Sequence, residues 1–456
     1  MPDDKRGEGE LKRAAAEPSG AGASPASPLD RFFGLSAAGS SVATEFRAGA
    51  ATFLTMAYIM FVNPVILTAA GMDHGAVFVA TCLAAAVGSL LIGLWANYPI
   101  AMAPGMGLNA YFAFTIVPEL GGNWQLALGC VFVSGVLFFL LSLSPLRVWL
   151  IDAIPMSLKL GIAAGIGFFL ALIALQNAGI VAADPATLVA LGDLSKPQAW
   201  LAAAGFLLIA GLAIRKIPGA IIVGVLAVTI AAVALGFEPW HGIAATPPSL
   251  APTFLQMDVA GVFQLGLVTI VLTLLLVTML DTAGTLIGVA RQAGLLDAEG
   301  RLPRARQAFL ADSGGAMLGA ALGTSTNTAY IESAAGVEEG GRTGLTAIFV
   351  ALFFLLALFL APLAQTVPAY ATAPALLFVA FLMAASLGAL RFDDATDYVP
   401  ALIIVLMMLL SYSIATGIGL GFIAYVALKA MAGRFREINV AVAVIALAFL
   451  LKLIFA

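Results

Sequence analysis

The chain has 456 residues, of which 62% are hydrophobic and only 10% are charged. A soluble domain of this size carries roughly 25% charged residues, so the composition excludes an ordinary soluble protein and predicts a surface that faces lipid. The net charge of −4 gives no sign of a nucleic-acid partner. Cys82 and Cys130 both lie in apolar runs, which argues against a disulfide framework or a metal cluster.

The first 45 residues differ from the rest of the chain. They hold the basic pairs Lys5-Arg6 and Lys12-Arg13, followed by a stretch rich in Gly, Ala, Ser and Pro. No apolar run of signal-peptide length follows the basic residues, so a cleaved signal is not expected. Residues 1–45 are predicted to form a disordered tail that stays in the cytoplasm, because basic residues resist translocation.

From Gly49 onward the chain is a series of apolar segments separated by short turns, and a helix needs roughly 20 such residues to cross a bilayer. The predicted crossings are 49–70, 76–96, 125–144, 156–179, 199–214, 217–236, 262–290, a weaker 306–322, 342–363, 369–390, 399–412 and 415–432. Two further segments, 100–118 and 323–337, are short and broken by glycine. The last apolar run, 437–455, is either one more crossing or a helix in the interface.

Lys and Arg predict the orientation. If the amino terminus is inside, the basic residues that follow each second crossing also lie inside: Arg147, Arg215, Lys216, Arg291, Arg301, Arg304, Arg306, Arg342 and Arg391. The opposite loops hold only Lys196. The chain is therefore predicted to be a multi-pass protein of the cell membrane with a cytoplasmic amino terminus.

Two halves of the sequence resemble each other. Residues 54–58 are similar to 277–281, and 104–111 to 323–330, at nearly the same separation. Seven crossings per half is an odd number, so the second copy enters the membrane inverted, as in secondary transporters.

The paired short segments predict the binding site. Their glycines and Pro104 disfavour a regular helix, so each segment is expected to run extended to mid-membrane and then begin a half-helix near Asn109 or Thr328. Half-helix amino termini present free N–H groups there, where such transporters bind their substrate. Two re-entrant structural loops without a ligand are the alternative.

Three acidic residues lie within predicted crossings. Asp281 is deep in the eighth crossing, and Glu332 is expected one turn into the second half-helix. Acidic residues at such depth are usually functional. The alternative is that Asp281 and Glu332 have a structural role and form hydrogen bonds to unpaired backbone groups. Asp312 is as compatible with capping or packing as with function. His74 and His241 have no ligand-type neighbours, so no metal and no cofactor are expected.

Three strings, 279–289, 328–337 and 104–112, resemble the azaguanine-type purine permeases, the hypoxanthine, guanine and adenine branch of the second nucleobase–cation symporter superfamily. The likeness runs from about Phe46 to the last residues. It implies an all-α polytopic fold of seven plus seven inverted spans, with half-helices in the third and tenth spans. The implied division is a core domain (46–145 and 262–363), a gate domain (146–261 and 364–432) and a C-terminal apolar segment (433–456).

The resemblance further implies proton-coupled uptake of a purine base, with the core moving against the gate. The residues expected to bind the base are Glu332, Asp281, Asn109, Thr328, Tyr58, Gly107, Ala329 and Thr278. Asp281 and Glu332 are also the candidates for the proton. Many relatives have an aspartate at the place of Thr278, which leaves the coupling site open. The expected partners are a purine base, a proton and the lipid bilayer, and a homodimer is one assembly to consider.

Other functions are compatible with parts of the sequence. An anion transporter of the same fold is the main alternative, although two acidic residues argue against an anion site. A membrane enzyme is disfavoured because no nucleophile–base arrangement or metal cluster occurs within the predicted spans. A passive channel and the ranking of the purines stay open.

Overall fold

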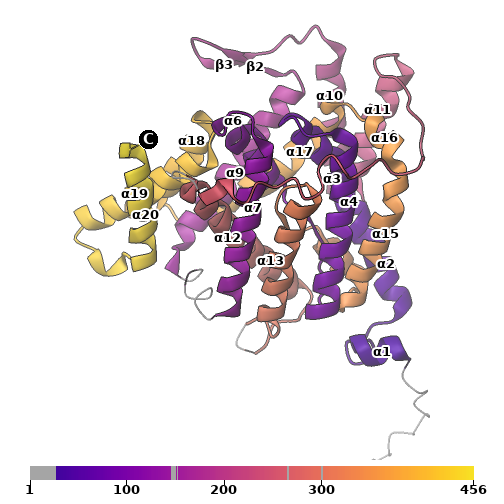
Figure 1. Ribbon diagram of the computed structural model, residues 1–456, viewed down its shortest axis with the longest axis horizontal. Coiled ribbons are helices and arrows are strands. Elements are labelled where there is room, and N and C mark those ends of the chain that lie inside the picture. Colours follow the sequence, from indigo (N-terminus) through magenta and orange to yellow (C-terminus); the bar gives the residue numbers. More distant parts are fainter. Residues whose placement is uncertain (1–26, 145–149, 151–152, 264–266, 299–300, 456) are drawn as a thin grey trace, which may run out of the picture.

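The computed structural model describes residues 27–144, 150, 153–263, 267–298 and 301–455. Within these residues the chain is a bundle of helices with two small two-stranded sheets (Figure 1). Nine of the described helices are long and apolar enough to cross a membrane, by length and composition. The predicted crossings correspond to helices whose limits differ from the expected ones by a few residues.

In each half of the chain, the described helices and strands correspond to seven predicted crossings. In the first half they are α2 (Val42–Met56) with α3 (Ile59–Thr68), α4 (His74–Leu91) with η1 (Ile92–Ala96), β1 (Met102–Pro104) with α5 (Met106–Tyr111), η2 (Phe112–Ile116) and α6 (Val117–Glu119), then α7 (Trp124–Leu143), α9 (Met156–Asn177), α10 (Pro197–Ile214) and α11 (Ala220–Ala234). In the second half they are α12 (Val268–Gln292), α13 (Ala305–Leu322), β4 (Asn327–Ala329) with α14 (Ser333–Glu338), α15 (Gly344–Ala357) with η4 (Leu358–Leu360) and α16 (Ala361–Thr366), α17 (Ala369–Ala384) with η5 (Ala385–Ala389), α18 (Ala395–Leu410) and α19 (Ile414–Met431). This order agrees with the predicted seven-plus-seven fold.

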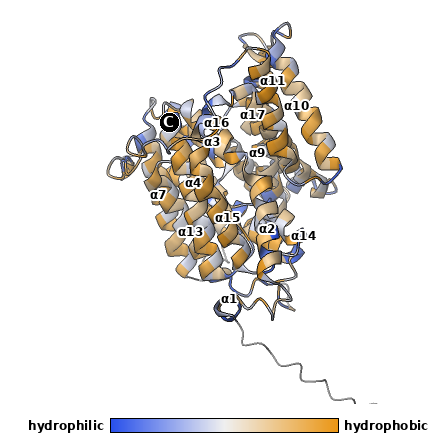
Figure 2. Ribbon diagram, turned by 90° about the vertical axis from the view of Figure 1, so that its right-hand side faces the viewer, coloured by the Kyte–Doolittle hydropathy of each residue, from blue (hydrophilic) through white to orange (hydrophobic). Residues whose placement is uncertain are grey.

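The helices pack in two groups. In one group α13 packs on α7 and α4, and α15 packs on α4 and α2; in the other, α9 packs on α17 and α18, and α10 packs on α11 and α17. Figure 2 shows α4, α7, α13 and α15 side by side, with α9, α10, α11 and α17 on the other side of the molecule. The division of the chain into a core and a gate domain, and their motion as two bodies, stay predictions.

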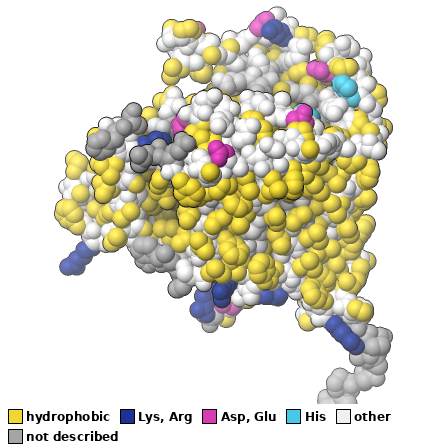
Figure 3. All heavy atoms as spheres, in the orientation of Figure 1, with side chains coloured by type: hydrophobic (Ala, Val, Ile, Leu, Met, Phe, Trp, Pro, Cys, Tyr) yellow, Lys and Arg dark blue, Asp and Glu magenta, His cyan; other side chains and the backbone are white. Residues whose placement is uncertain are grey.

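The outer surface carries a wide hydrophobic band (Figure 3). Large apolar side chains with more than half of their surface exposed contribute to this outer surface, among them Leu207, Ile230, Leu356 and Leu447. Most Lys and Arg side chains visible in this view lie at the edge next to α1 (Pro28–Phe33), while Asp, Glu and His lie mainly at the opposite edge. Such a band suits contact with lipid tails.

The predicted tail, residues 1–45, falls partly outside the described residues, and its described part differs from the prediction. Residues Pro28–Phe33 form α1, and α2 begins at Val42 with Ser41 as its capping residue. Phe33 and Leu35 are buried against Leu345 at the start of α15. The sequence did not predict this ordered structure, because a six-residue helix shows no clear periodicity.

Glu45 also lies in the predicted tail, yet it is fully buried. Its carboxylate accepts hydrogen bonds from the backbone N–H groups of Arg342 (3.1 Å), Thr343 (3.4 Å) and Thr346 (3.2 Å), and from the Thr346 hydroxyl. Helix amino termini carry unpaired N–H groups and partial positive charge. Glu45 of α2 therefore caps α15 across the helix interface.

Replacing Glu45 by alanine is expected to lower the free energy of unfolding by about 1–3 kcal/mol, because buried N–H donors lose their acceptor. The thermal unfolding midpoint of the purified variant measures this loss. Glu339→Ala is the matched control, since Glu339 is exposed at the end of α14. Equal midpoints for the two variants would contradict the capping role.

The loop at 180–198, predicted without secondary structure, contains a hairpin. In it β2 (Val181–Asp184) pairs antiparallel with β3 (Leu188–Leu191). The Asp184 carboxylate accepts from the N–H groups of Ala186 (2.8 Å) and Thr187 (2.9 Å), which closes the turn. These bonds, the one from Thr187 first, lower the pKa of Asp184 below its usual value. Aspartate often forms such turns, so residue 184 could have indicated a hairpin. The prediction considered only apolar runs and therefore missed it.

The connection between the two halves lies over the core helices. Backbone N–H groups of Leu255 and Asp258 donate to the carbonyls of Ala321 (2.8 Å) and Gln125 (2.9 Å), respectively. Gly323, at φ +90°, ends α13 here, and a Cβ on it would lie 2.2 Å from Thr253. Only glycine fits this close approach.

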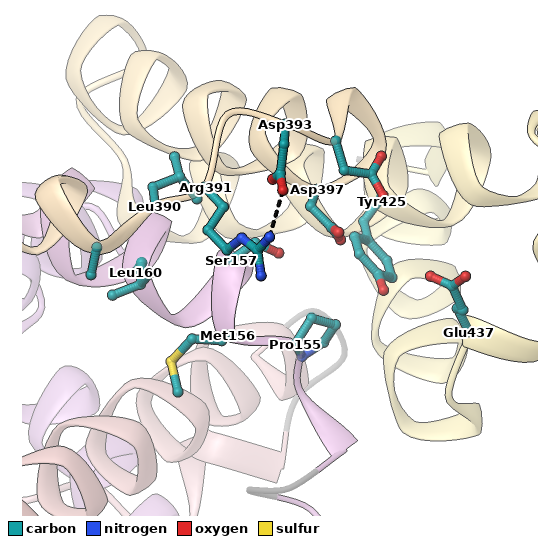
Figure 4. Close-up of a pocket in the computed structure, with 12 residues that line it drawn as sticks. Pro155, Met156, Ser157, Leu160, Leu390, Arg391, Asp393, Asp397, Tyr425 and Glu437 are labelled. Atoms are coloured by element: carbon teal, nitrogen blue, oxygen red, sulfur yellow. Dashed lines mark hydrogen bonds and ion pairs between the residues drawn. The ribbon is translucent and has the colours of Figure 1, made fainter.

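A cluster of charges joins α18 and α19 to η6 (Phe435–Glu437). Lys429 is 1% exposed and forms ion pairs with Asp397 (3.1 Å) and Glu437 (2.8 Å). Arg434 bonds to Asp394 and lowers the pKa of that carboxyl below its usual range. The cluster borders a cavity of about 490 Å³ between the start of α9 and α18, where Arg391 pairs with Asp393 (Figure 4).

The last apolar run forms α20 (Val440–Phe455), which packs along α19. The contact is close: a Cβ on Gly419 of α19 would lie 2.6 Å from the Phe449 ring.

Candidate functional site

The two glycine-broken segments meet inside the bundle. There β1 pairs antiparallel with β4, so that Met102 lies opposite Ala329, Ala103 opposite Thr328 and Pro104 opposite Asn327. All three pairs are buried. Each strand leads into a short helix, α5 after β1 and α14 after β4. The structure thus joins one segment of each half, as the repeat predicted, and adds a ladder that the sequence did not reveal.

The helices begin at other residues than expected. Predicted near Asn109 and Thr328, they begin at Met106 and Ser333. Thr328 lies in β4, and Glu332 occupies the N-cap position of α14 instead of lying one turn into it. The difference has a physical reason, since a β-branched threonine suits a paired strand better than a helix start.

Glu332 is held by a residue from the first half. It is partly buried, and one of its carboxylate oxygens accepts a hydrogen bond of 2.6 Å from the Tyr58 hydroxyl. Tyr58 is fully buried at the break between α2 and α3. This break aims the tyrosine at α14, which packs on α2. One oxygen of Glu332 is therefore fixed by Tyr58.

Asp281 lies in α12 beside β4 and α14. It is partly buried and makes no hydrogen bond to another side chain or backbone group in the described part of the chain. Asp281 and Glu332 lie close enough to interact electrostatically. The structure thus brings together the two acids that the sequence singled out.

Asp312 supports this arrangement from α13. It is fully buried, and its two oxygens accept from the Thr282 hydroxyl (2.6 Å) and from the Ala329 N–H group (2.8 Å). The Thr282 hydroxyl lies 3.1 Å from that of Thr328. Asp312 therefore ties β4 to the helix turn that carries Asp281. The sequence left its role open, although its position within an apolar crossing was the signal used for the other two acids.

Asn109 is fully buried and bonded within the paired segments. Its side-chain oxygen accepts from the Ser325 hydroxyl, and its amide lies 3.4 Å from the Pro104 carbonyl. The Tyr330 hydroxyl donates to the same carbonyl at 2.6 Å. Sequence reasoning missed Ser325, which belongs to the Gly-Thr-Ser run of the second segment.

Gly107 belongs to α5 and Thr278 to α12. A Cβ on Gly107 would lie 2.4 Å from a methyl group of Ile166, so glycine allows α5 to approach α9. Thr278 is 2% exposed, and its hydroxyl has no hydrogen-bond partner among the described residues. The substrate-binding roles of all eight predicted residues stay predictions.

Known proteins resemble the chain over most of its length. The family model Xan_ur_permease, described as "Permease family", matches residues 43–420. Adenine permease AdeP of Escherichia coli (strain K12) is 47% identical over 427 residues, 94% of this chain and 96% of AdeP. Guanine/hypoxanthine permease PbuG of Bacillus subtilis (strain 168) is 44% identical over 439 residues, 94% of this chain and 100% of PbuG.

A solved structure shares the fold. The transmembrane domain of the cyanobacterium bicarbonate transporter BicA matches with a TM-score of 0.61 and 16% identity, over 82% of this chain and 97% of that domain. At this identity the likeness shows the seven-plus-seven inverted-repeat fold alone. The sequence relatives carry the family assignment, because they align over nearly their full length. The chain belongs to the permease family, and it is a multi-pass membrane transporter and not an enzyme.

Proposed function

We propose that the chain imports a purine nucleobase together with a proton. The names of its relatives, an adenine permease and a guanine/hypoxanthine permease, support the substrate class. The observation that carries the proposal is the acidic pair, Glu332 and Asp281, beside the ladder that joins the two halves.

The acidic pair suits the edge of a purine. A purine presents N–H donors and carbonyl or ring-nitrogen acceptors in one plane, and a carboxylate accepts from the donors. Tyr58 occupies one oxygen of Glu332, so the remaining acceptor capacity of this carboxylate is available to the base. In this proposal Thr328 and Asn109 contact the base. Asp312 supports the site, because it bonds to both β4 and α12.

Asp281 is the better candidate for the proton. Two nearby carboxylates repel each other when both are ionised, so a proton on one of them relieves this repulsion. Glu332 is stabilised by the Tyr58 hydroxyl, whereas Asp281 lacks a comparable donor within the described chain. We assign the proton to Asp281 and the main contact with the base to Glu332.

Transport requires the site to open to each side in turn, and we propose that the core moves against the gate. One side-chain hydrogen bond joins the core to the gate at η2. The Thr115 hydroxyl of η2 donates to the Tyr412 carbonyl of the gate (3.0 Å). Within the gate, the Tyr412 hydroxyl donates to the Gln176 side chain of α9 (3.0 Å). Tyr412 stands at the turn between α18 and α19. Movement of the core past the gate would break the hydrogen bond between Thr115 and Tyr412.

The alternative, an anion transporter, rests on the fold alone. BicA is a bicarbonate transporter by its title, but its identity to this chain is 16%. An anion site needs cationic or N–H lining, and an acidic pair disfavours it.

Uptake into proteoliposomes tests the proposal. We expect labelled adenine, guanine or hypoxanthine to accumulate inside when the outside is more acidic, and this accumulation to vanish with a proton ionophore. One proton per base corresponds to about tenfold accumulation per pH unit. Accumulation of bicarbonate or sulfate without any purine would instead support the anion transporter, and purine uptake that ignores the proton gradient would overturn the coupling.

A further inference from the structure

A second cavity, of about 400 Å³, opens at the edge of the molecule next to α1. Its walls come from α1 and the turn after it, the end of η1, the turn before α13 and the start of α15. The residues that line it are Arg31, Phe32, Phe33, Gly34, Ala37, Ala38, Asn97, Tyr98, Leu295, Pro303, Arg304, Arg342 and Thr343. They include three arginines and no acidic residue.

The charge of these arginines is not neutralised by an ion pair within the described residues. Arg31, Arg304 and Arg342 form no ion pair with a described carboxylate. The Arg304 guanidinium stacks over Tyr98 at 5.9 Å, and that of Arg342 donates only to backbone carbonyls. Three positive charges gathered around one cavity attract an anion.

Two carboxylates, Asp30 and Glu45, lie near the cavity and bind other groups. Asp30 accepts from the backbone N–H group and the hydroxyl of Ser36, both at 2.7 Å. Glu45 accepts from the N–H groups at the start of α15. Neither carboxylate is paired with an arginine side chain of the cavity.

The walls of the cavity are fixed to one another. The Asn97 side chain donates to the Phe33 carbonyl (2.9 Å) and accepts from the Gly344 N–H group (2.6 Å). The Arg304 N–H group donates to the Tyr98 hydroxyl at 3.0 Å. Four separate stretches of chain therefore hold the arginines around one space, as a preformed site requires.

We propose that this cavity binds the phosphate group of an anionic phospholipid from the leaflet next to α1. Guanidinium groups bind phosphate oxygens through paired, charge-assisted hydrogen bonds. Basic pockets on the cytoplasmic side of membrane proteins suit lipid headgroups. Two observations favour a lipid over a free phosphate ion. The cavity is lined by α1, which lies at the edge of the hydrophobic band where most of the visible Lys and Arg side chains gather (Figure 3), and Phe32 of α1 is 61% exposed. The bound lipid would fasten α1 to the starts of α13 and α15.

The test measures lipid affinity of the full-length protein in detergent by thermal shift, with phosphatidylglycerol, phosphatidylcholine or inorganic phosphate added. We expect phosphatidylglycerol to raise the unfolding midpoint more than either other addition. An arginine near the surface contributes about 1 kcal/mol to binding of an anionic lipid, roughly fivefold in affinity. The Arg31→Gln, Arg304→Gln double variant should thus bind phosphatidylglycerol about 25-fold more weakly.

The matched control is the Arg215→Gln, Lys216→Gln double variant. Both residues are exposed at the end of α10, outside the cavity, so the same charge is removed elsewhere. Equal weakening in the two double variants would overturn the site, and equal stabilisation by inorganic phosphate would overturn the lipid as its ligand. Hydrogen exchange in residues 28–35 gives a second readout: phosphatidylglycerol should slow it in the wild type and the control, and unchanged exchange would contradict the proposal.

Discussion

Replacing Glu332 by glutamine is expected to weaken binding of the purine about 10- to 100-fold. A hydrogen bond to a charged group contributes about 1.5–3 kcal/mol, and every 1.4 kcal/mol is tenfold in affinity. If the glutamine oxygen stays on the Tyr58 hydroxyl, its amide group turns a donor toward the N–H edge of the base. Equilibrium binding of labelled base to the purified variant measures the loss.

Tyr58→Phe is the control for this experiment. It removes the 2.6 Å hydrogen bond to Glu332 but leaves the carboxylate in place. Its affinity should fall less than that of Glu332→Gln, because only the position of the acceptor is relaxed. Unchanged binding in Glu332→Gln, with a wild-type unfolding midpoint, would show that another residue recognises the base.

The Asp281→Asn variant is expected to lose proton-driven accumulation while it keeps exchange of the base. Asparagine has nearly the same shape but cannot carry the proton, so a pH gradient no longer drives net uptake. The wild type should reach about tenfold accumulation per pH unit for one proton per base, and the variant should stop at equal concentrations. Proteoliposomes with and without a pH gradient measure both values.

Counterflow separates coupling from simple inactivation. Liposomes loaded with unlabelled base should still take up labelled base through Asp281→Asn. Asp393→Asn serves as the control, since Asp393 is exposed and paired with Arg391 away from the site. If Asp281→Asn still concentrates the base tenfold, the proton is bound elsewhere, with Glu332 as the next candidate.

The sequence predicted the helices well because apolar length alone identifies a crossing. Even 306–322, weakened by Asp312 and its glycines, corresponds to α13 (Ala305–Leu322). The N-terminal boundary was placed too late, because Glu45 resembles a solvated residue of a tail. Its partners at the start of α15 are about 300 residues away in the sequence. A capping interaction over this distance cannot be predicted from local sequence.

The site was predicted in outline but not in its bonds. Glycine and proline in two matching segments indicated extended chain, and the β1–β4 ladder contains that chain. Its register could not be predicted, since pairing depends on how α12 and α13 place β4. The bond from Tyr58 to Glu332 and the bracing by Asp312 likewise depend on packing between distant elements.

The ladder between β1 and β4 has a consequence for the order in which the protein matures. Residues 102–104 leave the ribosome more than two hundred positions before 327–329, their only strand partner in the described chain. Until then the backbone groups of β1 lack these bonds, which hydrocarbon does not supply, so β1 should stay in contact with water. A nascent chain that stops before residue 327 should therefore stay sensitive to proteases near β1, however many of its helices have already been inserted.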